Sequence, residues 1–472
     1  MRVPWGSGRF ERVLVYGLGL SGRAAARLLL DRGVAVLAAD DRAEIEPGDL
    51  AGEPKFELMA AAELDSRWER LGPIDAVVVS PGVPPGRPLL AEARRRGLPV
   101  LAEVELAFPL LNGPVAAITG TNGKSTTTAL TGSLLAAAGF AVEVCGNIGE
   151  PLSARVEGPP GRIFVVELSS FQIEGLHTFR PRAAAFLNLA EDHLDRYGDL
   201  ASYAAAKGRL FRDQEGGEGG AGDTAVLNAD DPITAAVAAR SRRRLFSRRV
   251  RVADGCFAAA GTVVEVAPGE PDRELFAVSQ VPLAGVQNLE NAMAAALLAL
   301  AMGAERAALA GGLARFSGLP HRMQQVALHG GVAFYDDSKG TNPAATAKSL
   351  EGFRDASVHL ILGGRNKGAD LGSLAPLVGR KARRVYLIGE AAAELERALA
   401  GAAPLELAET LERAVRSAAV HAAPGEAVVL SPACASFDQF RNFAHRGESF
   451  QQQVRAVLAA AGAGGAGEAA HG

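Results

Sequence analysis

Residues 120–128 (GTNGKSTTT) constrain the fold of this 472-residue chain more than any other segment. They follow an apolar, β-branched run over 115–119 and precede a helical pattern over 129–138. A glycine-rich turn between a strand and a helix points backbone N–H groups at one spot, where the helix dipole also favours anions. The segment therefore predicts a strand–turn–helix unit that binds a polyphosphate.

Two side chains of this turn suit phosphate chemistry, since Lys124 can neutralise phosphate charge and Ser125 can ligate Mg²⁺. The spacing differs from the standard Walker A pattern, because Ile118 stands five positions before Gly123 where that pattern has glycine. We interpret the segment as a shortened P-loop. The alternative is an ordinary strand-to-helix turn.

Length and charge narrow the class of protein. A chain of 472 residues exceeds the size of a single core, so two or three domains are expected. The net charge of −4 argues against a nucleic-acid footprint, and we interpret the basic cluster 242–249 as a solvated face. The three cysteines show no metal or disulfide spacing and suit buried positions in a reducing compartment. No signal peptide or long apolar span is visible, so we expect a cytoplasmic protein that binds no membrane. Separately, we expect a monomer.

Strand and helix patterns alternate in three α/β blocks, which predicts parallel sheets covered on both faces. We place the domains at 1–112, 113–318 and 319–472, because Gly-Pro signals fall near both boundaries. The expected folds are a Rossmann-like first domain, a central P-loop ATPase-like domain and a Rossmann-like third domain. A glycine-acid loop over 213–223 and an Ala/Gly tail over 459–472 are expected to be mobile.

The first block carries a dinucleotide fingerprint, GLGLSG at 17–22, between a strand and a helix. Asp40 and Asp41 end the next strand, where a ribose-binding acid is expected. The physics of the motif is diphosphate binding, which NAD and a UDP-sugar both offer. We favour UDP, because nothing downstream resembles a hydride-transfer site. The segment 80–84 (SPGVP) is either a plain turn or a wall of the nucleotide crevice.

The central block places polar residues at strand ends. Glu167 ends a buried strand and suits Mg²⁺, although it could instead cap a helix. His193 follows the next strand and is a candidate ligand, with a structural histidine as the alternative. Lys207 reads from the sequence as a solvated helix lysine. Of Asn288 and Asn291, which begin another helix, one is expected to cap it and the other to face a base.

Taken together, the motifs resemble the Mur ligase family, the ATP-dependent amino-acid ligases of peptidoglycan precursor synthesis, and in particular its D-glutamate-adding branch. The resemblance covers essentially the whole chain, and the DNPR-type sequence of the diaminopimelate- or lysine-adding branch is absent. The segments that carry it are GLGLSG, GTNGKSTTT, ELSSFQIE, EDHLDRYGDLASYAAAK, GLPHRMQ, YDDSKGTNPAAT, LGGRNKGAD and SPACASFDQFRNFAHRGESF.

The resemblance implies ligation of D-glutamate to UDP-N-acetylmuramoyl-L-alanine through an acyl phosphate, with ATP and two Mg²⁺ ions. ATP is expected to contact the turn and four further residues, which are Gly120, Thr121, Asn122, Gly123, Lys124, Ser125, Thr126, Asn291, Arg322, Asp337 and Lys339. Ser125 and Glu167 are expected to bind one Mg²⁺, and His193 and a carbamylated Lys207 the second. Lys124, His193 and Lys207 are the expected catalytic residues.

The same resemblance assigns the other two substrates. The UDP-substrate is expected to contact Leu20, Ser21, Asp40, Asp41, Gly82 and Asn147. D-Glutamate is expected to lie among Thr341, Lys367, Ser436, Phe437 and Phe443. Two positions depart from the family pattern, because Gly340 stands where alanine is expected and Phe437 where leucine is common. Folate polyglutamylation and a non-catalytic nucleotide-binding regulator are the rival functions.

Overall fold

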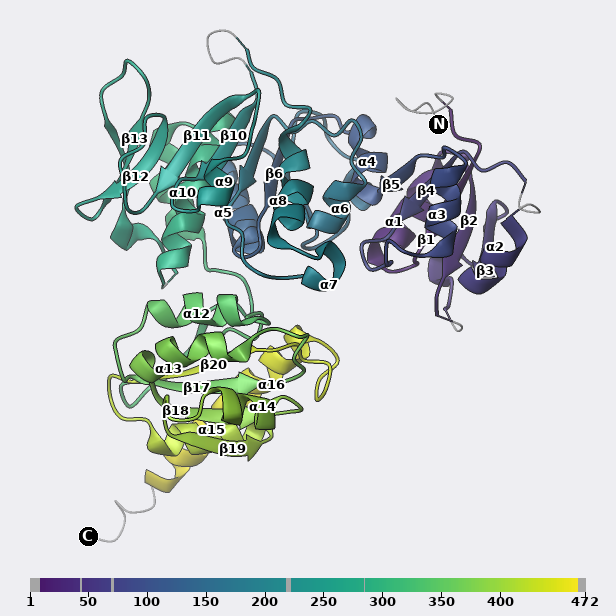
Figure 1. Cartoon of the computed structure of the whole chain (residues 1–472). Coiled ribbons are helices and arrows are strands. Elements are labelled where there is room, and N and C mark those ends of the chain that lie inside the picture. The colour runs from purple at the N-terminus through teal and green to yellow at the C-terminus, as the bar shows by residue number, and fades with distance from the viewer. Residues whose placement is uncertain (1–8, 43–44, 69–71, 218–221, 284, 466–472) are drawn as a thin grey trace, which may run out of the picture. The chain divides into compact units, whose positions relative to one another are not determined.

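The computed structural model (Figure 1) contains three sheets, and it describes residues 9–42, 45–68, 72–217, 222–283 and 285–465. The chain divides into two compact units. The first holds two of the sheets and is built from Met1–Leu189, His193–Val278 and Asn291–Arg315. The second holds the third sheet and is built from Ala190–Asp192, Ser279–Glu290 and Phe316–Gly472.

The first sheet is parallel throughout, with the strand order β3-β2-β1-β4-β5. Its strands are β1 (Arg12–Tyr16), β2 (Ala35–Asp40), β3 (Phe56–Ala60), β4 (Ala76–Val79) and β5 (Val100–Ala102). Its helices are α1 (Leu20–Asp31), α2 (Ala61–Arg67) and α3 (Pro88–Arg95). The order reverses beside β1, so the turn after β1 lies at a topological switch point, where open α/β sheets bind ligands.

The central sheet has nine strands in the order β14-β13-β12-β11-β10-β9-β6-β8-β7. The expectation of a wholly parallel sheet is wrong here, because β13 pairs antiparallel with both β12 and β14. The strand before the P-loop, β6, lies between β9 and β8. The strands are β6 (Val115–Thr119), β7 (Val142–Gly146), β8 (Ile163–Glu167), β9 (Ala183–Phe186), β10 (Thr224–Asn228), β11 (Arg242–Ser247), β12 (Gly255–Ala259), β13 (Thr262–Val266) and β14 (Arg273–Ala277).

Helices of the central part include the P-loop helix, the longer α10 and several short ones. They are α5 (Lys124–Ala137), α6 (Ser170–Glu174), α7 (Leu194–Tyr197), α8 (Leu200–Gly208), α9 (Pro232–Ala235), α10 (Val286–Ala301) and α11 (Arg306–Arg315). Because β6 is flanked by parallel strands, the carboxyl ends of β6, β7, β8 and β9 meet at one edge. The P-loop turn therefore shares that edge with the strand-end polar residues.

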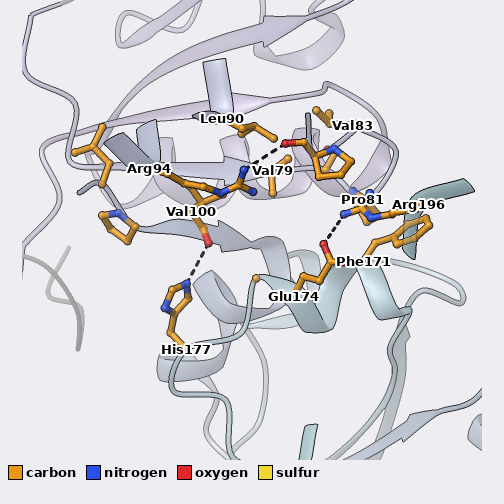
Figure 2. Close-up of a pocket in the computed structure, with 15 residues that line it drawn as sticks. Val79, Pro81, Val83, Leu90, Arg94, Val100, Phe171, Glu174, His177 and Arg196 are labelled. Carbon is orange, nitrogen blue, oxygen red and sulfur yellow. Dashed lines mark hydrogen bonds and ion pairs between the residues drawn. The ribbon is translucent and has the colours of Figure 1, made fainter. Parts of the chain in front are cut away.

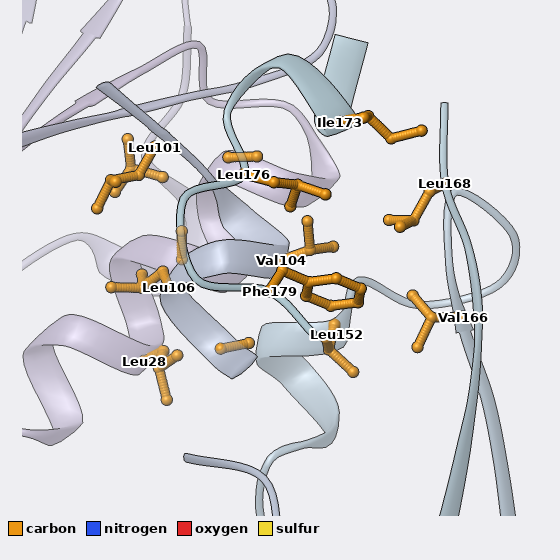
Figure 3. Close-up of a cluster of buried hydrophobic side chains, with 14 of the residues drawn as sticks. Leu28, Leu101, Val104, Leu106, Leu152, Val166, Leu168, Ile173, Leu176 and Phe179 are labelled. Carbon is orange, nitrogen blue, oxygen red and sulfur yellow. The ribbon is translucent and has the colours of Figure 1, made fainter. Parts of the chain in front are cut away.

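The first two sheets share one hydrophobic core, which crosses the expected domain boundary at residue 112. Helix α4 (Glu103–Ala107) follows β5 and contributes Val104 and Leu106, and Phe179 joins them from the segment after α6 (Figure 3). The buried Glu105 carboxylate accepts hydrogen bonds from the N–H groups of Thr178 (2.7 Å) and Phe179 (3.1 Å). The two sheets are thus held by packing and by a satisfied buried charge.

The third sheet has the order β15-β16-β20-β17-β18-β19 and is parallel except for the β15–β16 pair. Apolar clusters cover both of its faces. Its strands are β15 (Gln324–His329), β16 (Val332–Asp336), β17 (Val358–Gly363), β18 (Ala382–Ile388), β19 (Leu405–Glu409) and β20 (Ala427–Ala433). Its helices are α12 (Pro343–Glu351), α13 (Ala375–Lys381), α14 (Ala392–Ala398), α15 (Leu411–His421) and α16 (Phe443–Gly465).

Several smaller expectations can be compared with the structure. The three cysteines are buried free thiols, which confirms that prediction. The solvated-face interpretation of the basic cluster is wrong for Arg244, which is buried and pairs with Glu265 (2.5 Å). The ends of the glycine-acid loop are tied to Arg180 through Glu215 and Asp223, while residues 218–221 lie outside the described part.

The expected frayed tail is helical as far as Gly465, because α16 continues through it, and residues 466–472 lie outside the described ranges. In the part of the chain that the structure describes, no helix is both long and apolar enough to span a bilayer.

Candidate active site

The predicted site residues fall into two groups, one in each unit. In the first unit, the P-loop turn joins β6 to α5 and contains two glycines in the left-handed region, Gly120 (φ 151°) and Gly123 (φ 83°). A Cβ atom on Gly123 would lie 2.3 Å from Oδ1 of Asn291, so only glycine fits there. The turn therefore directs its backbone amides and the start of a 14-residue helix at one place.

Lys124 lies over this turn, with its Nζ donating to the carbonyl oxygens of Gly120 (3.0 Å) and Thr121 (2.9 Å). Ser125 and Thr126 follow in the first turn of α5 and are both buried. The arrangement gathers one ammonium group, two hydroxyl groups and the loop amides. This composition suits a polyphosphate with a bound Mg²⁺ ion.

Asn188 supports the turn from the segment after β9, a role that the sequence reasoning missed. Its Oδ1 accepts the N–H of Asn122 (2.9 Å) and its Nδ2 donates to the carbonyl of Asn122 (3.0 Å). Its backbone carbonyl also accepts the N–H of Thr121 (3.0 Å). The available signal was its place at a strand end on the same sheet edge.

Asn291 lies in α10 and is buried against the P-loop. Its Oδ1 accepts the hydroxyl of Thr127 (3.2 Å). The structure thus brings Asn291 to the nucleotide turn, whereas contact with a base stays a prediction.

Glu167 ends β8 and is almost fully buried. Its Oε1 accepts Nδ2 of Asn147 (2.7 Å), and among the described residues its Oε2 is buried without a hydrogen-bond partner. An ionised oxygen left without a donor is costly, and a divalent cation would satisfy it. The alternative of a helix cap is wrong, because Ser169 caps α6 and forms a capping box with Gln172.

Asn147 is held against the same carboxylate by its backbone. Its N–H donates to the carbonyl oxygen of Glu167 (2.9 Å). Gly146 (φ 103°) permits this approach, because a Cβ there would lie 2.5 Å from that oxygen. Asn147 and Glu167 therefore form one rigid pair at the ends of β7 and β8.

Lys207 is 1 % exposed, so its interpretation as a solvated helix lysine is wrong. Its Nζ donates to the carbonyl of Gly120 (2.9 Å) and lies 4.4 Å from the centre of the Tyr203 ring. His193, in a left-handed conformation (φ 55°), packs edge-on against Phe171 (4.8 Å) and Tyr203 (6.3 Å). The structure places Lys207 at the P-loop and joins His193 to it through Tyr203.

Within the described ranges, no three His, Cys, Asp or Glu side chains gather to hold a metal ion. Mg²⁺ often keeps water and substrate phosphates as most of its ligands, so a hydroxyl and one carboxylate suffice from the protein. Ser125 and Glu167 fit such a site.

In the fingerprint turn of the first sheet, the carbonyl oxygen of Gly17 is approached closely by Gly22 and by Ser80. A Cβ on Gly22 would lie 1.8 Å from the carbonyl oxygen of Gly17, which is itself left-handed (φ 89°). That same oxygen accepts the hydroxyl of Ser80 (2.6 Å), so the segment 80–84 packs on the turn. Ser21 and the exposed Leu20 begin α1, and Gly82 is also exposed.

Asp40 and Asp41 end β2 beside this turn. Asp40 accepts the N–H of Leu18 (2.7 Å) and pairs with Arg42 (2.8 Å). Burial opposes its ionisation, but the hydrogen bonds from Arg42 and Leu18 outweigh burial and lower the pKa of Asp40 to about 2. Asp41 accepts the hydroxyl of Tyr16 (2.7 Å).

A crevice within the first unit is lined by the segment after β4, which packs on the fingerprint turn through Ser80, and by Phe171 and Glu174 of α6 (Figure 2). Ser80 and Phe171 both line it, and Phe171 also contacts His193. The walls are pinned by His177, whose Nε2 contacts the carbonyl of Val100 (3.1 Å), and by an Arg196–Glu174 ion pair (2.6 Å). The full lining is Val79, Ser80, Pro81, Val83, Pro85, Leu90, Arg94, Leu98, Pro99, Val100, Phe171, Glu174, Gly175, His177 and Arg196.

In the second unit, the predicted residues lie at the carboxyl edge of the third sheet. The Nζ of Lys339 lies 3.8 Å from the centre of the Phe443 ring. Asp337 is buried, which raises the pKa of its carboxyl to about 6 against the hydrogen bonds from Ser349 and Ser431 (2.7 Å each). The unusual Gly340 fits this packing, because a Cβ there would lie 2.8 Å from the Asp337 carboxylate.

The remaining predicted residues follow other strands of that edge. Lys367 follows β17, Ser436 and Phe437 follow β20, and Thr341 precedes α12. Ser436 is buried, whereas Phe437 is 64 % exposed. Arg322 follows His321, which is left-handed (φ 61°) and contacts Asp336 through Nδ1 (2.7 Å).

Arg446 of α16 supports this edge and was also missed. It is fully buried and donates to both the hydroxyl (3.0 Å) and the carbonyl (2.9 Å) of Ser338, and to the carbonyl of Cys434 (3.1 Å). Burial lowers its pKa to about 10, against the attraction of Asp438. A sequence pattern does not distinguish such an arginine from an exposed one.

Comparison with known proteins gives consistent matches along the chain. Three family profiles match, the Mur ligase MurD-like N-terminal domain over residues 11–102, the Mur ligase middle domain over 118–299 and the Mur ligase glutamate ligase domain over 321–434. UDP-N-acetylmuramoylalanine--D-glutamate ligase of Solibacter usitatus is 44% identical over 450 residues, covering 94% of this chain and 98% of that protein.

The protein of the same name from Geotalea uraniireducens is 45% identical over 462 residues, covering 96% of this chain and 99% of its own. Among solved structures, UDP-N-acetylmuramate-alanine ligase MurC from Thermotoga maritima matches with a TM-score of 0.58 and 18% identity, covering 94% of this chain and 99% of that chain. The solved structure supports the fold, and the two sequence relatives, with the family profiles, establish family membership. The chain belongs to the Mur ligase family.

Proposed function

We propose that this chain joins D-glutamate to UDP-N-acetylmuramoyl-L-alanine with cleavage of ATP to ADP and phosphate, as a cytoplasmic monomer in peptidoglycan precursor synthesis. Near full-length relatives that carry this ligase name support the substrates. The observation that carries the proposal is the P-loop with Lys124 over it, at the same sheet edge as Glu167 with its unsatisfied buried oxygen.

The first chemical step forms an acyl phosphate. The alanyl carboxylate of the UDP-substrate attacks the γ-phosphorus of ATP, forming a C–O–P linkage as the β,γ-bridging P–O bond breaks and ADP leaves. Two anions must approach, so the loop amides and Lys124 stabilise the charge on the transferred phosphoryl group. Ser125 and Glu167 would hold Mg²⁺, which would supply positive charge against the same repulsion when bound.

The second step forms the amide bond. The amine of D-glutamate attacks the acyl carbon, and the tetrahedral intermediate expels inorganic phosphate while the nitrogen loses a proton. Our proposed contacts for D-glutamate are Thr341, Lys367, Ser436, Phe437 and Phe443. Lys339, Arg322 and Asp337 are our proposed contacts for ATP in the second unit.

A second Mg²⁺ site is proposed at His193 and a carbamylated Lys207. Carbamylation converts the ammonium into a carboxylate-like group, which gives a cation a ligand beside the P-loop. The burial of Lys207 and its contact with Gly120 support this position. A lysine on a solvated helix face would offer no such site.

The UDP-substrate is proposed to bind at the fingerprint turn of the first sheet, with Leu20, Ser21, Asp40, Asp41 and Gly82. The crevice lined by Ser80 and Phe171 adjoins this turn, because Ser80 donates to Gly17, and it is our proposed site for the sugar. The match of residues 11–102 to the MurD-like N-terminal domain favours this substrate over folate, since a folate ligase is expected to lack the UDP-binding block.

One incubation tests the proposal. The protein is mixed with ATP, Mg²⁺, UDP-N-acetylmuramoyl-L-alanine and either D- or L-glutamate, and products are identified by mass spectrometry. We expect an amide product with D-glutamate only, and ¹⁸O from the donor carboxylate in the released phosphate. Phosphate release with L-glutamate alone would overturn the substrate assignment, and ¹⁸O confined to the donor would overturn the acyl phosphate.

A further inference from the structure

Three loops at the carboxyl ends of β17, β18 and β20 are joined in a closed ring of contacts. Arg365 and Ala435 exchange backbone hydrogen bonds of 2.8 and 3.0 Å. The guanidinium of Arg365 also pairs with the carboxylate of Glu390 through two contacts of 2.9 Å. The N–H of Glu390 donates to Oδ2 of Asp438 (3.1 Å), which returns the ring to the third loop.

Two glycines allow these loops to approach so closely. Gly364 (φ 131°) lies against the third loop, where a Cβ would be 2.1 Å from the carbonyl oxygen of Ala435. Gly389 (φ 72°) lies under Asp438, where a Cβ would be 2.1 Å from Oδ2. The Asp438 carboxylate therefore fills the space that a side chain at residue 389 would take.

The segment between the two anchored positions contains Ser436 and Phe437. Ala435 fixes its beginning through Arg365, and Asp438 fixes its end through Glu390. Phe437 is 64 % exposed, so core packing does not hold its side chain in place. The orientation of Phe437 therefore depends on the two anchors rather than on burial, whereas Ser436 beside it is itself buried.

We propose that Asp438 is a positioning residue for the amino-acid substrate, acting through the Glu390 N–H to set the orientation of Ser436 and Phe437. The inference rests on the proposed function, because it takes this segment to contact D-glutamate. A carboxylate accepts a backbone N–H more strongly than a neutral group does. Loss of the anchor should loosen the acceptor pocket and leave the two nucleotide sites intact.

Asp438→Ala and Asp438→Asn provide the test, with kcat, the three KM values and the thermal midpoint measured for each. We expect Asp438→Ala to raise KM for D-glutamate at least about tenfold, as for loss of a charged hydrogen bond. KM for ATP and for the UDP-substrate should stay at the wild-type values. Asp438→Asn should recover part of the loss, because its amide oxygen still accepts the Glu390 N–H.

Asp75→Ala is the matched control. Its carboxylate also accepts backbone N–H groups, from Glu11 (2.7 Å) and Arg12 (2.9 Å), but at the amino end of β1 in the first unit. It should lower the thermal midpoint without a selective change in KM for D-glutamate. An unchanged KM for D-glutamate in Asp438→Ala, or an equal change in all three KM values, overturns the proposal.

Failure of the proposed function is visible separately, in the wild type. If wild-type protein releases no phosphate with D-glutamate, the acceptor that does support turnover is found from the other amino acids. The same three variants are then titrated with that acceptor. A selective rise in its KM in Asp438→Ala still supports the positioning role, and an unchanged KM rejects it.

Discussion

Two lysine side chains share one carbonyl oxygen at the P-loop turn. The Nζ atoms of Lys124 and Lys207 both donate to Gly120, at 3.0 and 2.9 Å. Two ammonium groups this close repel each other, more strongly in a buried site than in water. Conversion of Lys207 to a carbamate replaces that repulsion with attraction. Electrostatics at the scale of single residues thus favours different roles for the two lysines.

Lys124→Ala should lower kcat by ~10²–10⁴, by analogy with the loss of one preorganised donor to a developing negative charge. ADP release under saturating substrates measures this. Lys348→Ala is the control, because Lys348 lies on α12 and pairs only loosely with Glu351 (3.8 Å). Turnover of Lys124→Ala near the wild-type rate would exclude this lysine from phosphoryl transfer.

Lys207→Ala should be almost inactive and should regain part of its turnover when short carboxylates are added, since these can replace the carbamate. The same carboxylates should not rescue Lys124→Ala, whose missing group is a cation. Activity is measured as phosphate release across a carboxylate titration. A fully active Lys207→Ala would show that the buried amine has only a structural role.

Asp40 should make the free energy of unfolding depend on pH. Its native pKa of about 2 lies below the unfolded value of 3.8, so it stabilises the native state above pH 3.8 and loses this effect as the pH falls toward 2. The shift corresponds to about 2 kcal/mol. Asp40→Asn should therefore be less stable than wild type at pH 7 in denaturant titrations, with a smaller difference at pH 3. A difference that is independent of pH would contradict this.

At the scale of elements, strands with continuous apolar runs were predicted from the sequence, and edge strands were not. Strand β6 has the expected bounds, 115–119. Strand β3 was missed because it is an edge strand without a fully buried residue, and β12–β14 because their antiparallel pairing has no helix between strands.

The candidate site likewise contains some residues that the sequence predicted and others that it did not. Glycine turns and strand-end acids were visible in the sequence, because backbone geometry and sheet polarity fix where they lie. The burial of Lys207 was not visible, because its helix is rich in alanine and has no clear polar face. Arg446 was invisible for a related reason, since its donors satisfy carbonyl groups from distant loops.

Two left-handed glycines lie at opposite ends of α5, and replacing each by alanine distinguishes the cost of backbone strain from the loss of nucleotide binding. Gly123→Ala adds a Cβ that would lie 2.3 Å from Asn291, whereas Gly139→Ala (φ 88°) meets nothing within 4 Å. Both should cost about 1 kcal/mol of stability through the backbone conformation. Only Gly123→Ala should also abolish ADP binding, measured by calorimetry. Equal ADP affinity in the two variants would refute a special role for the turn.

At the scale of the whole molecule, the first two sheets share a core through α4 and Phe179, which predicts that they unfold as one body. The matches to separate N-terminal and middle family domains do not predict this sharing. A common core makes unfolding of one sheet expose apolar surface of the other. We therefore expect the two glycine-rich turns of this unit to unfold cooperatively.

Calorimetry can test this cooperativity. UDP-substrate and ADP, added separately, should each raise the temperature of the same unfolding transition, because a ligand stabilises the whole cooperative unit that it binds. Phe179→Ala removes a buried ring whose centre lies 4.8 Å from that of Phe108. It should lower the free energy of unfolding by about 3–5 kcal/mol, and with it the temperature of that transition. Val420→Ala is the control, since Val420 is 77 % exposed. If the two ligands raise two different transitions, the first two sheets unfold independently and the shared core does not couple them.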